Sequence, residues 1–149
     1  MAKITEDYVS FAVSKLLKEK GFDGECQKVY MYNGQLLLAQ NFMEGESFVD
    51  NTSIHIVGKD ALWNCKKQGD YAYLCPTLQM AMKWLVREHR LYVNVAPSVE
   101  GYYWTEKWHS YVEELNKRHP FGTFIGTFNS HEEACEAAIK YCLEKKLIL

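Results

Sequence analysis

The stretch from Cys75 to His89 most constrains what this chain can fold into. Pro76 is compatible with a helix only in its first turn, and apolar residues then recur at the three- and four-residue spacing of one helical face. These residues are Leu78, Ala81, Met82, Leu85 and Val86. We therefore predict that this segment forms a core helix and that the other elements pack around it.

The bulk properties of the chain indicate one ordinary globular domain, with or without a small appended unit. It has 149 residues, of which 48% are hydrophobic and 24% charged. Apolar runs are short and the N-terminus carries Lys3, Glu6 and Asp7, so neither a membrane span nor a secretion signal is expected. Five cysteines at irregular spacing favour reduced thiols. We expect a cytoplasmic protein in which Cys135 and Cys142 are buried and inert.

Residues 1–40 are predicted to form an N-terminal helix and a β-hairpin. The helix has an apolar stripe at helical spacing, and Thr5 is its expected N-cap. The dipeptide Asn33-Gly34 is a strong hairpin signal between two extended runs, residues 27–32 and residues 35–40.

Residues 41–75 are predicted to be a long irregular connection. Turn-forming residues flank a short alternating segment, residues 53–57, and helical spacing returns briefly in residues 61–67. Trp63 and its tyrosine neighbours up to residue 73 have two interpretations: they pack over the core, or they form a surface for a partner.

Three strands are predicted after the core helix. The first, residues 91–96, alternates in the manner of a strand and is expected to end at Pro97. Residues 102–115 fit either a helix or a strand. We prefer a strand, because residues 122–128 are clearly extended and follow a turn-prone link, so that the two runs make a hairpin.

A final helix follows the third strand. Ser130 and Glu133 have the spacing of a capping box, and further acidic residues nearby favour the positive end of the helix dipole. Residues 76–149 are therefore expected to form an α-β-β-β-α unit. Together with the N-terminal helix and hairpin, this predicts an α+β fold with an antiparallel sheet packed by helices.

An unusual concentration of aromatic residues lies between Gly101 and Tyr111. Six of these eleven positions are aromatic when His109 is counted. One interpretation is that alternate side chains of a strand fill the core; the other is an anchor set for a partner. Under the second interpretation the candidate partner-binding residues are Trp63, Tyr102, Tyr103, Trp104 and Trp108.

No sequence motif recommends an enzyme. There is no phosphate-binding loop, dinucleotide fingerprint, nucleophile elbow or paired-cysteine zinc motif. The five histidines include no pair three or four residues apart, so we predict no metal ligands, no cofactor and no catalytic residues. An enzyme whose groups converge from distant parts of the chain remains a further hypothesis.

The charge balance gives no general attraction to nucleic acid or to anionic membranes. Seventeen basic residues oppose nineteen acidic ones, for a formal charge of −2. One set of basic residues in the C-terminal half is still a candidate for nucleic-acid contact. Its members are Arg87, Arg90, Lys107, Lys117 and Arg118.

Three segments carry a resemblance at the level of structural positions. They are the helix Val9–Gly21, the helix containing Pro76–Leu85, and the run Phe128–Ala134 leading into Ala137–Leu143. In this order they resemble small uncharacterised proteins carried by phages and integrated elements of Bacteroides-type bacteria. The resemblance covers most of the chain, brings no functional residue with it, and implies a cytoplasmic accessory protein of mobile-element origin.

The element order from Pro76 onward is similar to that of the double-stranded RNA-binding domain fold. Such domains grip phosphate with lysines at the start of the last helix. Here that place holds His131, Glu132, Glu133 and Glu136, so the main phosphate contact of that family is absent and like charges oppose RNA.

The leading hypothesis from the sequence is therefore a non-enzymatic accessory or interaction protein. It would bind a protein partner, or itself, through aromatic surface in residues 61–73 or residues 102–111. The alternative is a nucleic-acid-binding module that uses the C-terminal unit.

Overall fold

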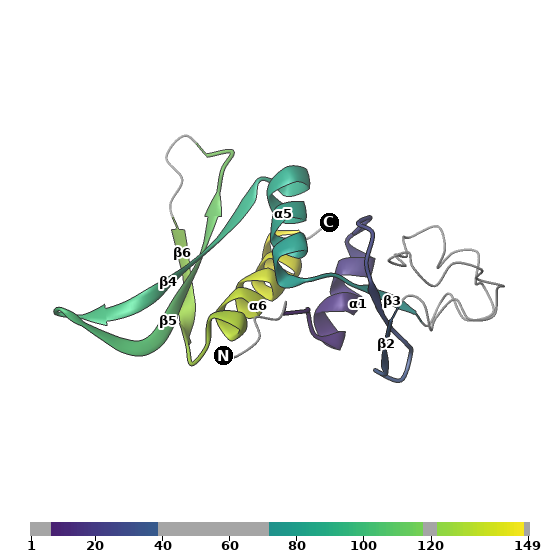
Figure 1. The fold of residues 1–149 in the computed structure, drawn as a ribbon. Coiled ribbons are helices and arrows are strands. Elements are labelled where there is room, and N and C mark those ends of the chain that lie inside the picture. The colour runs from purple at the N-terminus through teal and green to yellow at the C-terminus, as the bar shows by residue number, and fades with distance from the viewer. Residues whose placement is uncertain (1–6, 39–71, 118–121, 148–149) are drawn as a thin grey trace. The chain divides into compact units, whose positions relative to one another are not determined.

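The computed structural model describes residues 7–38, 72–117 and 122–147. The chain divides into two compact units, Met1–Thr77 and Leu78–Leu149. Each unit contains a three-stranded antiparallel sheet and at least one helix (Figure 1), so the predicted α+β class is confirmed. Within the described ranges, no helix combines the length and the apolar character needed to cross a membrane.

The N-terminal unit consists of one helix and a small sheet. Helix α1 (Phe11–Glu19) is followed by strands β1 (Lys28–Tyr30) and β2 (Leu36–Leu38), and β3 (Tyr73–Cys75) completes the sheet in the order β2-β1-β3. The Asn33-Gly34 hairpin is confirmed, because Gly34 has φ +86° and Asn33 Oδ1 accepts a hydrogen bond from the Gln35 amide at 3.0 Å.

The start of α1 differs from the prediction. The expected N-cap, Thr5, lies outside the described residues, and the helix begins only at Phe11, with Ser10 as its N-cap. The Ser10 hydroxyl accepts a hydrogen bond from the Val13 amide at 3.3 Å. Val9 is buried and lies outside the helix, and its amide donates to the Pro76 carbonyl at 3.1 Å. Because Val9 pairs with this distant residue, the helix does not extend back to Val9 and begins two residues later.

The start of the core helix was also predicted too early. Helix α5 runs over Leu78–His89, whereas Cys75 belongs to β3 and pairs with Lys28. Pro76 is therefore outside the helix, and Thr77 forms a bridge with Tyr8. The core positions Leu78, Ala81 and Leu85 are buried as expected, and Trp84 is buried as well.

The C-terminal unit has the predicted α-β-β-β-α order. After α5 come strands β4 (Leu91–Glu100), β5 (Tyr103–Glu114) and β6 (Gly122–Phe128), then helix α6 (His131–Tyr141) and a π-helical turn, η1 (Cys142–Lys146). Strand order is β4-β5-β6, and all pairs are antiparallel. The Ser130 hydroxyl caps α6 by accepting from the Glu133 amide at 3.1 Å. Residues 103–114 are a strand, as preferred from the sequence.

Pro97 does not end β4, contrary to the prediction. The strand continues to Glu100, with a register shift between Pro97 and Val99. Proline removes one backbone donor, which an edge strand tolerates because one side of it faces no partner strand. Among the described strands β4 lies at the edge of its sheet, so its pairing with β5 survives the proline.

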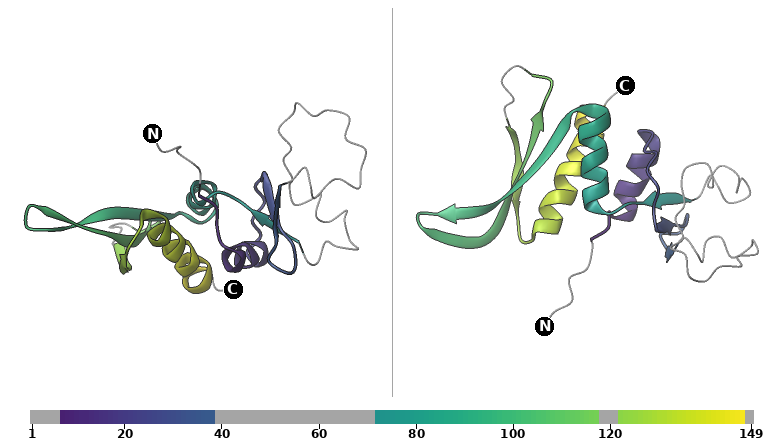
Figure 2. Two further views of the ribbon diagram at one scale, coloured as in Figure 1. Left: turned by 60° about the horizontal axis from the view of Figure 1, so that its bottom comes forward. Right: turned by 45° about the horizontal axis from the view of Figure 1, so that its top comes forward.

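Helix α6 packs against all three strands of this sheet, and α5 packs against α6 and β4. The left view of Figure 2 shows α6 along one face of the sheet. Side chains of β5 on that face, Ser110 and Val112, are buried, as are Ala138 and Ile139 of α6. The opposite face of the sheet carries none of the unit's described helices. We call it the open face.

Candidate functional site

The aromatic stretch lies at the end of the hairpin formed by β4 and β5. The last pair between β5 and β6 is Trp108 with Phe128, whereas β4 and β5 stay paired as far as Glu100 and Tyr103. Residues 98–107 therefore form a two-stranded ribbon that extends past β6 (Figure 1). We call these residues the hairpin tip.

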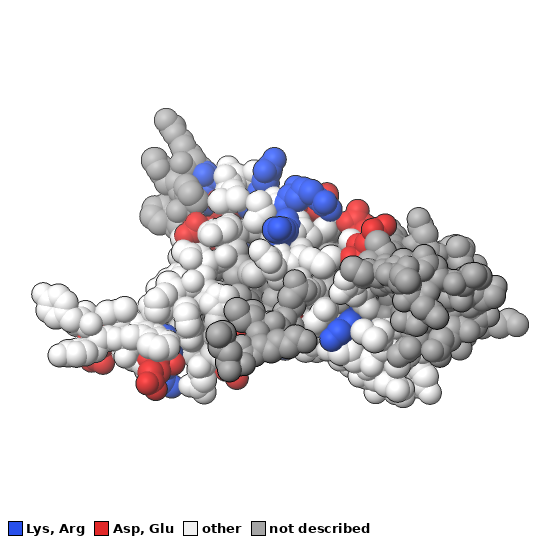
Figure 3. All heavy atoms as spheres, viewed as in Figure 1, with Lys and Arg blue, Asp and Glu red and all other residues white. Residues whose placement is uncertain are grey.

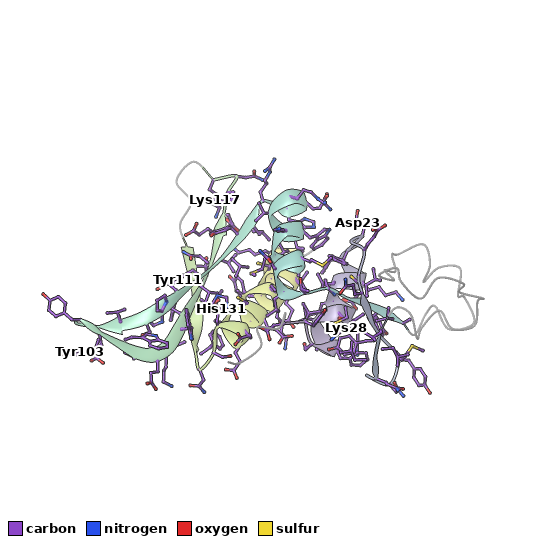
Figure 4. All side chains as sticks on the ribbon, in the orientation of Figure 1. Asp23, Lys28, Tyr103, Tyr111, Lys117 and His131 are labelled. Atoms are coloured by element: carbon purple, nitrogen blue, oxygen red, sulfur yellow. The ribbon has the colours of Figure 1, made fainter. Side chains whose placement is uncertain are left out.

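Three consecutive aromatic residues at the hairpin tip are exposed. The exposed fraction is 100% for Tyr102, 80% for Tyr103 and 54% for Trp104. Tyr103 lies at the far end of the ribbon in Figure 4. Gly101, with φ +63°, permits the tight turn that places them there. These three side chains therefore do not fill the core, which was one of the two interpretations of this stretch.

Contacts along β5 connect the hairpin tip to the helix-covered part of the sheet. The rings of Trp104 and Trp108 meet edge to face at 5.9 Å between centroids, and Trp108 meets the His131 ring at 5.2 Å. Trp108 is half-buried, in contrast to the tip residues. The Thr105 hydroxyl also donates to the Ser98 carbonyl at 3.0 Å across the ribbon. The tip is thus an ordered projection supported at its base.

A second aromatic cluster lies on the open face and was not anticipated as a unit. The Phe124 ring is 5.4 Å from Tyr111 and 5.5 Å from His109, centroid to centroid. His109 Nδ1 is also 3.0 Å from Thr127 Oγ1. Phe124 is 54% exposed, and Tyr92 on the same face is exposed as well. The alternation of residues 107–113 in the sequence indicates that His109 and Tyr111 share a face. That Phe124 of β6 joins them depends on the strand register.

The structure brings together part of the predicted basic cluster. Arg87 lies in the last turn of α5, Arg90 joins α5 to β4, and Lys117 follows β5; the Arg90 carbonyl accepts from the Leu115 amide at 2.8 Å. Figure 3 shows basic side chains at this end of the unit. Arg118 lies outside the described residues.

Lys107 does not belong to this cluster. It lies at the hairpin tip, where its ammonium donates to Asn129 Oδ1 at 3.0 Å. About ten residues of chain, most of them in β5, separate it from Lys117, which corresponds to about 30 Å. The structure therefore does not bring Lys107 together with Arg87, Arg90 and Lys117.

Acidic partners reduce the positive potential of the remaining basic cluster. Arg87 Nε pairs with Glu88 at 2.9 Å, and Lys117 pairs with Glu114. Glu114 also pairs with Lys146 at 2.8 Å. The hydrogen bond from Lys117, with that from Lys146, lowers the pKa of Glu114, so the carboxylate stays ionised.

The described thiols are buried rather than presented to a substrate. Cys26, Cys75, Cys135 and Cys142 are all buried. Burial, with a contribution from Cys75, raises the pKa of Cys26 to about 12, and burial raises that of Cys142 to about 12. A protonated thiol is a poor nucleophile, so these two groups are unsuited to covalent chemistry at neutral pH.

His131 and Cys135 form a thiol–imidazole pair within α6. The Cys135 sulfur is 3.6 Å from His131 Nδ1, but the thiol is 2% exposed. Within the described ranges no group of three or more histidine, cysteine or acidic side chains could hold a metal ion. The candidate residue Trp63 lies outside those ranges.

Comparisons with known protein families, with curated proteins and with solved structures give no match.

Proposed function

We propose that this chain is a non-enzymatic accessory protein of the cytoplasm, of the kind that phages and mobile elements carry, and that it binds a protein partner through the hairpin tip. The observation that carries the proposal is the exposure of Tyr102, Tyr103 and Trp104 at the end of a two-stranded projection. Tyrosine and tryptophan are the residue types most enriched at the energetic centres of protein interfaces.

The shape of the hairpin tip suits insertion into a concave surface. An isolated two-stranded ribbon is marginally stable, so large apolar side chains at its end gain more by contacting a partner than by contacting their own ribbon. Tyrosine and tryptophan lose little rotamer freedom on binding and keep a polar group for a hydrogen bond. The expected partner is a protein with an apolar pocket and a polar rim.

The proposal is tested by replacing the three tip aromatics together, Tyr102→Ser, Tyr103→Ser and Trp104→Ser. A partner captured by the wild-type chain is purified and its affinity measured for both proteins by calorimetry. We expect the triple variant to bind at least tenfold more weakly, because each anchor residue contributes on the order of 1–2 kcal/mol. Trp104 emission is expected to shift to shorter wavelength on binding.

Tyr32→Ser is the matched control, since Tyr32 is also an exposed aromatic residue near a hairpin turn, in the N-terminal unit. It should leave the affinity unchanged. If the triple variant binds the partner as tightly as the wild type while both remain folded by circular dichroism, the hairpin tip is not the binding site.

A second candidate function is nucleic-acid binding at Arg87, Arg90 and Lys117, favoured by their convergence at one end of the C-terminal unit. Its test is a salt titration with a short RNA duplex, because phosphate contacts make affinity fall steeply with added salt. The glutamates paired with Arg87 and Lys117 lower the expected affinity, and an absence of binding even at low ionic strength would exclude this function.

A further inference from the structure

The side chains on the open face of the C-terminal sheet are complementary to the same face of a second copy of the chain. Successive residues of a strand alternate between faces, so Lys107, His109, Tyr111 and Glu113 of β5 share the open face. The register adds Phe124 and Tyr92 from the two neighbouring strands. A cluster of rings thus occupies the centre, a lysine stands at one end and a glutamate at the other.

From this pattern we infer that two copies of the chain associate through their open faces, with their β5 strands antiparallel. In a closed dimer the same patch meets itself across a two-fold axis. When that axis lies midway between the two sheets, nearly perpendicular to β5 and level with Ser110, which is midway between residues 107 and 113, Lys107 lies opposite Glu113 of the partner subunit. The same pair forms a second time on the other side of the axis.

The geometry of packed sheets allows these contacts. Facing sheets lie about 10 Å apart, which two layers of aromatic side chains fill. Residues 107 and 113 are about 10 Å from the axis, so the crossing angle of about 30° displaces them by roughly 5 Å, which a lysine side chain spans. The bond from Lys107 to Asn129 leaves further ammonium hydrogens for a carboxylate.

Charge and chemistry favour a second copy over a nucleic acid on this face. Aromatic rings on a sheet can stack nucleobases, and such platforms are flanked by basic residues that contact phosphate. Here the end of the face opposite Lys107 is occupied by Glu113, which repels phosphate but complements the lysine of a second copy. The interface shares only Lys107 with the hairpin tip and leaves out its exposed aromatic residues, so it does not depend on the function proposed for the tip.

The expected dimer is weak. Three strands about 4.8 Å apart and about seven residues long present a face of a few hundred Å², which is below the roughly 800 Å² per partner of a standard interface. Sedimentation equilibrium of the whole chain from about 1 μM to 1 mM should therefore show reversible dimerisation with a Kd in the micromolar range. Phe124→Ser, at an exposed position, should raise the Kd at least tenfold.

Charge reversal tests the antiparallel arrangement. Lys107→Glu alone sets carboxylate against carboxylate at both ends and Glu113→Lys alone sets ammonium against ammonium, so each should raise the Kd about tenfold. The double variant Lys107→Glu/Glu113→Lys restores both pairs and should recover the wild-type Kd. Tyr103→Ser, at the hairpin tip, is the control and should leave the Kd unchanged.

Three results would overturn the inference. A chain that stays monomeric at every concentration has no such interface. Dimerisation that persists in Phe124→Ser and in both single charge reversals places the contact elsewhere. A monomeric chain that binds a single-stranded oligouridine and loses that binding in Phe124→Ser uses the open face to stack bases.

Discussion

The two ends of strand β5 both carry apolar and acidic side chains but have opposite environments. At one end Ser110 and Val112 are buried beneath α6, whereas at the other Tyr103 and Trp104 are exposed. The difference arises because β6 stops at Phe128, opposite Trp108, and α6 begins three residues later. Burial is therefore decided by how far the third strand and the helix extend, and not by the residues of β5 themselves.

The largest effect is expected when side-chain volume is removed from each end of β5. Val112→Ala deletes two buried methyl groups and should lower the free energy of unfolding by about 2–3 kcal/mol, including the cavity it leaves. Tyr103→Ala deletes far more atoms at the tip but should cost less than about 0.5 kcal/mol. Urea denaturation at low protein concentration measures both. Equal losses would mean that the tip is packed as firmly as the covered part of the sheet.

A smaller effect is expected from the hydrogen bonds at the two ends. The Ser110 hydroxyl is fully buried and donates to the Ala134 carbonyl at 2.8 Å, so Ser110→Ala should cost about 1–2 kcal/mol. Thr105 makes a similar bond at the partly exposed tip, where water can replace it, so Thr105→Val should cost less than about 0.5 kcal/mol. The same urea titrations compare the two variants. A larger loss of unfolding free energy for Thr105→Val than for Ser110→Ala would contradict the difference between the two ends of β5.

A third prediction concerns the backbone of the hairpin tip. Glu106 has φ +66°, a conformation that glycine adopts without the Cβ penalty, so Glu106→Gly should stabilise the tip by about 0.5–1 kcal/mol. Glu100→Gly, in regular strand geometry on the same ribbon, should instead destabilise it. Amide hydrogen exchange of residues 99–107 reports this local stability. Faster exchange in Glu106→Gly would show that the backbone at Glu106 is not strained.

The sequence predicted the elements of this fold better than their ends. Periodicity identified α5, and capping and turn signals identified α6 and the Asn33-Gly34 hairpin. The errors at Thr5, Pro76 and Pro97 have one cause, because each boundary is set by pairing with another segment, as when Cys75 joins Lys28 in a sheet. Local patterns do not contain that information.

The candidate sites, like the element boundaries, depend on contacts between segments that local sequence patterns do not contain. The sequence identified Tyr102, Tyr103 and Trp104 as unusual but left their burial open, since exposure depends on the relative lengths of β5 and β6. The basic residues were grouped only as members of the C-terminal half, and the length of β5 keeps Lys107 apart from Lys117. The open-face cluster was missed because His109 and Phe124 meet through strand register, which includes a bulge between Ser110 and Tyr111.

The smallest expected effect lies at the covered end of β5, at Glu114. Its pKa is lowered from the usual 4.5 by hydrogen bonds from Lys117 and Lys146, so the pairs stabilise the fold above about pH 4.5 and the contribution disappears as pH falls through the lowered value. The same bond raises the pKa of Lys146, whose contribution is lost only above its usual 10.5. Glu114→Gln should therefore cost about 0.5 kcal/mol at pH 7 and nothing at pH 2. Thermal unfolding across this pH range, with Glu144→Gln as the control, measures the difference; an equal loss at both pH values would assign the effect of Glu114 to packing.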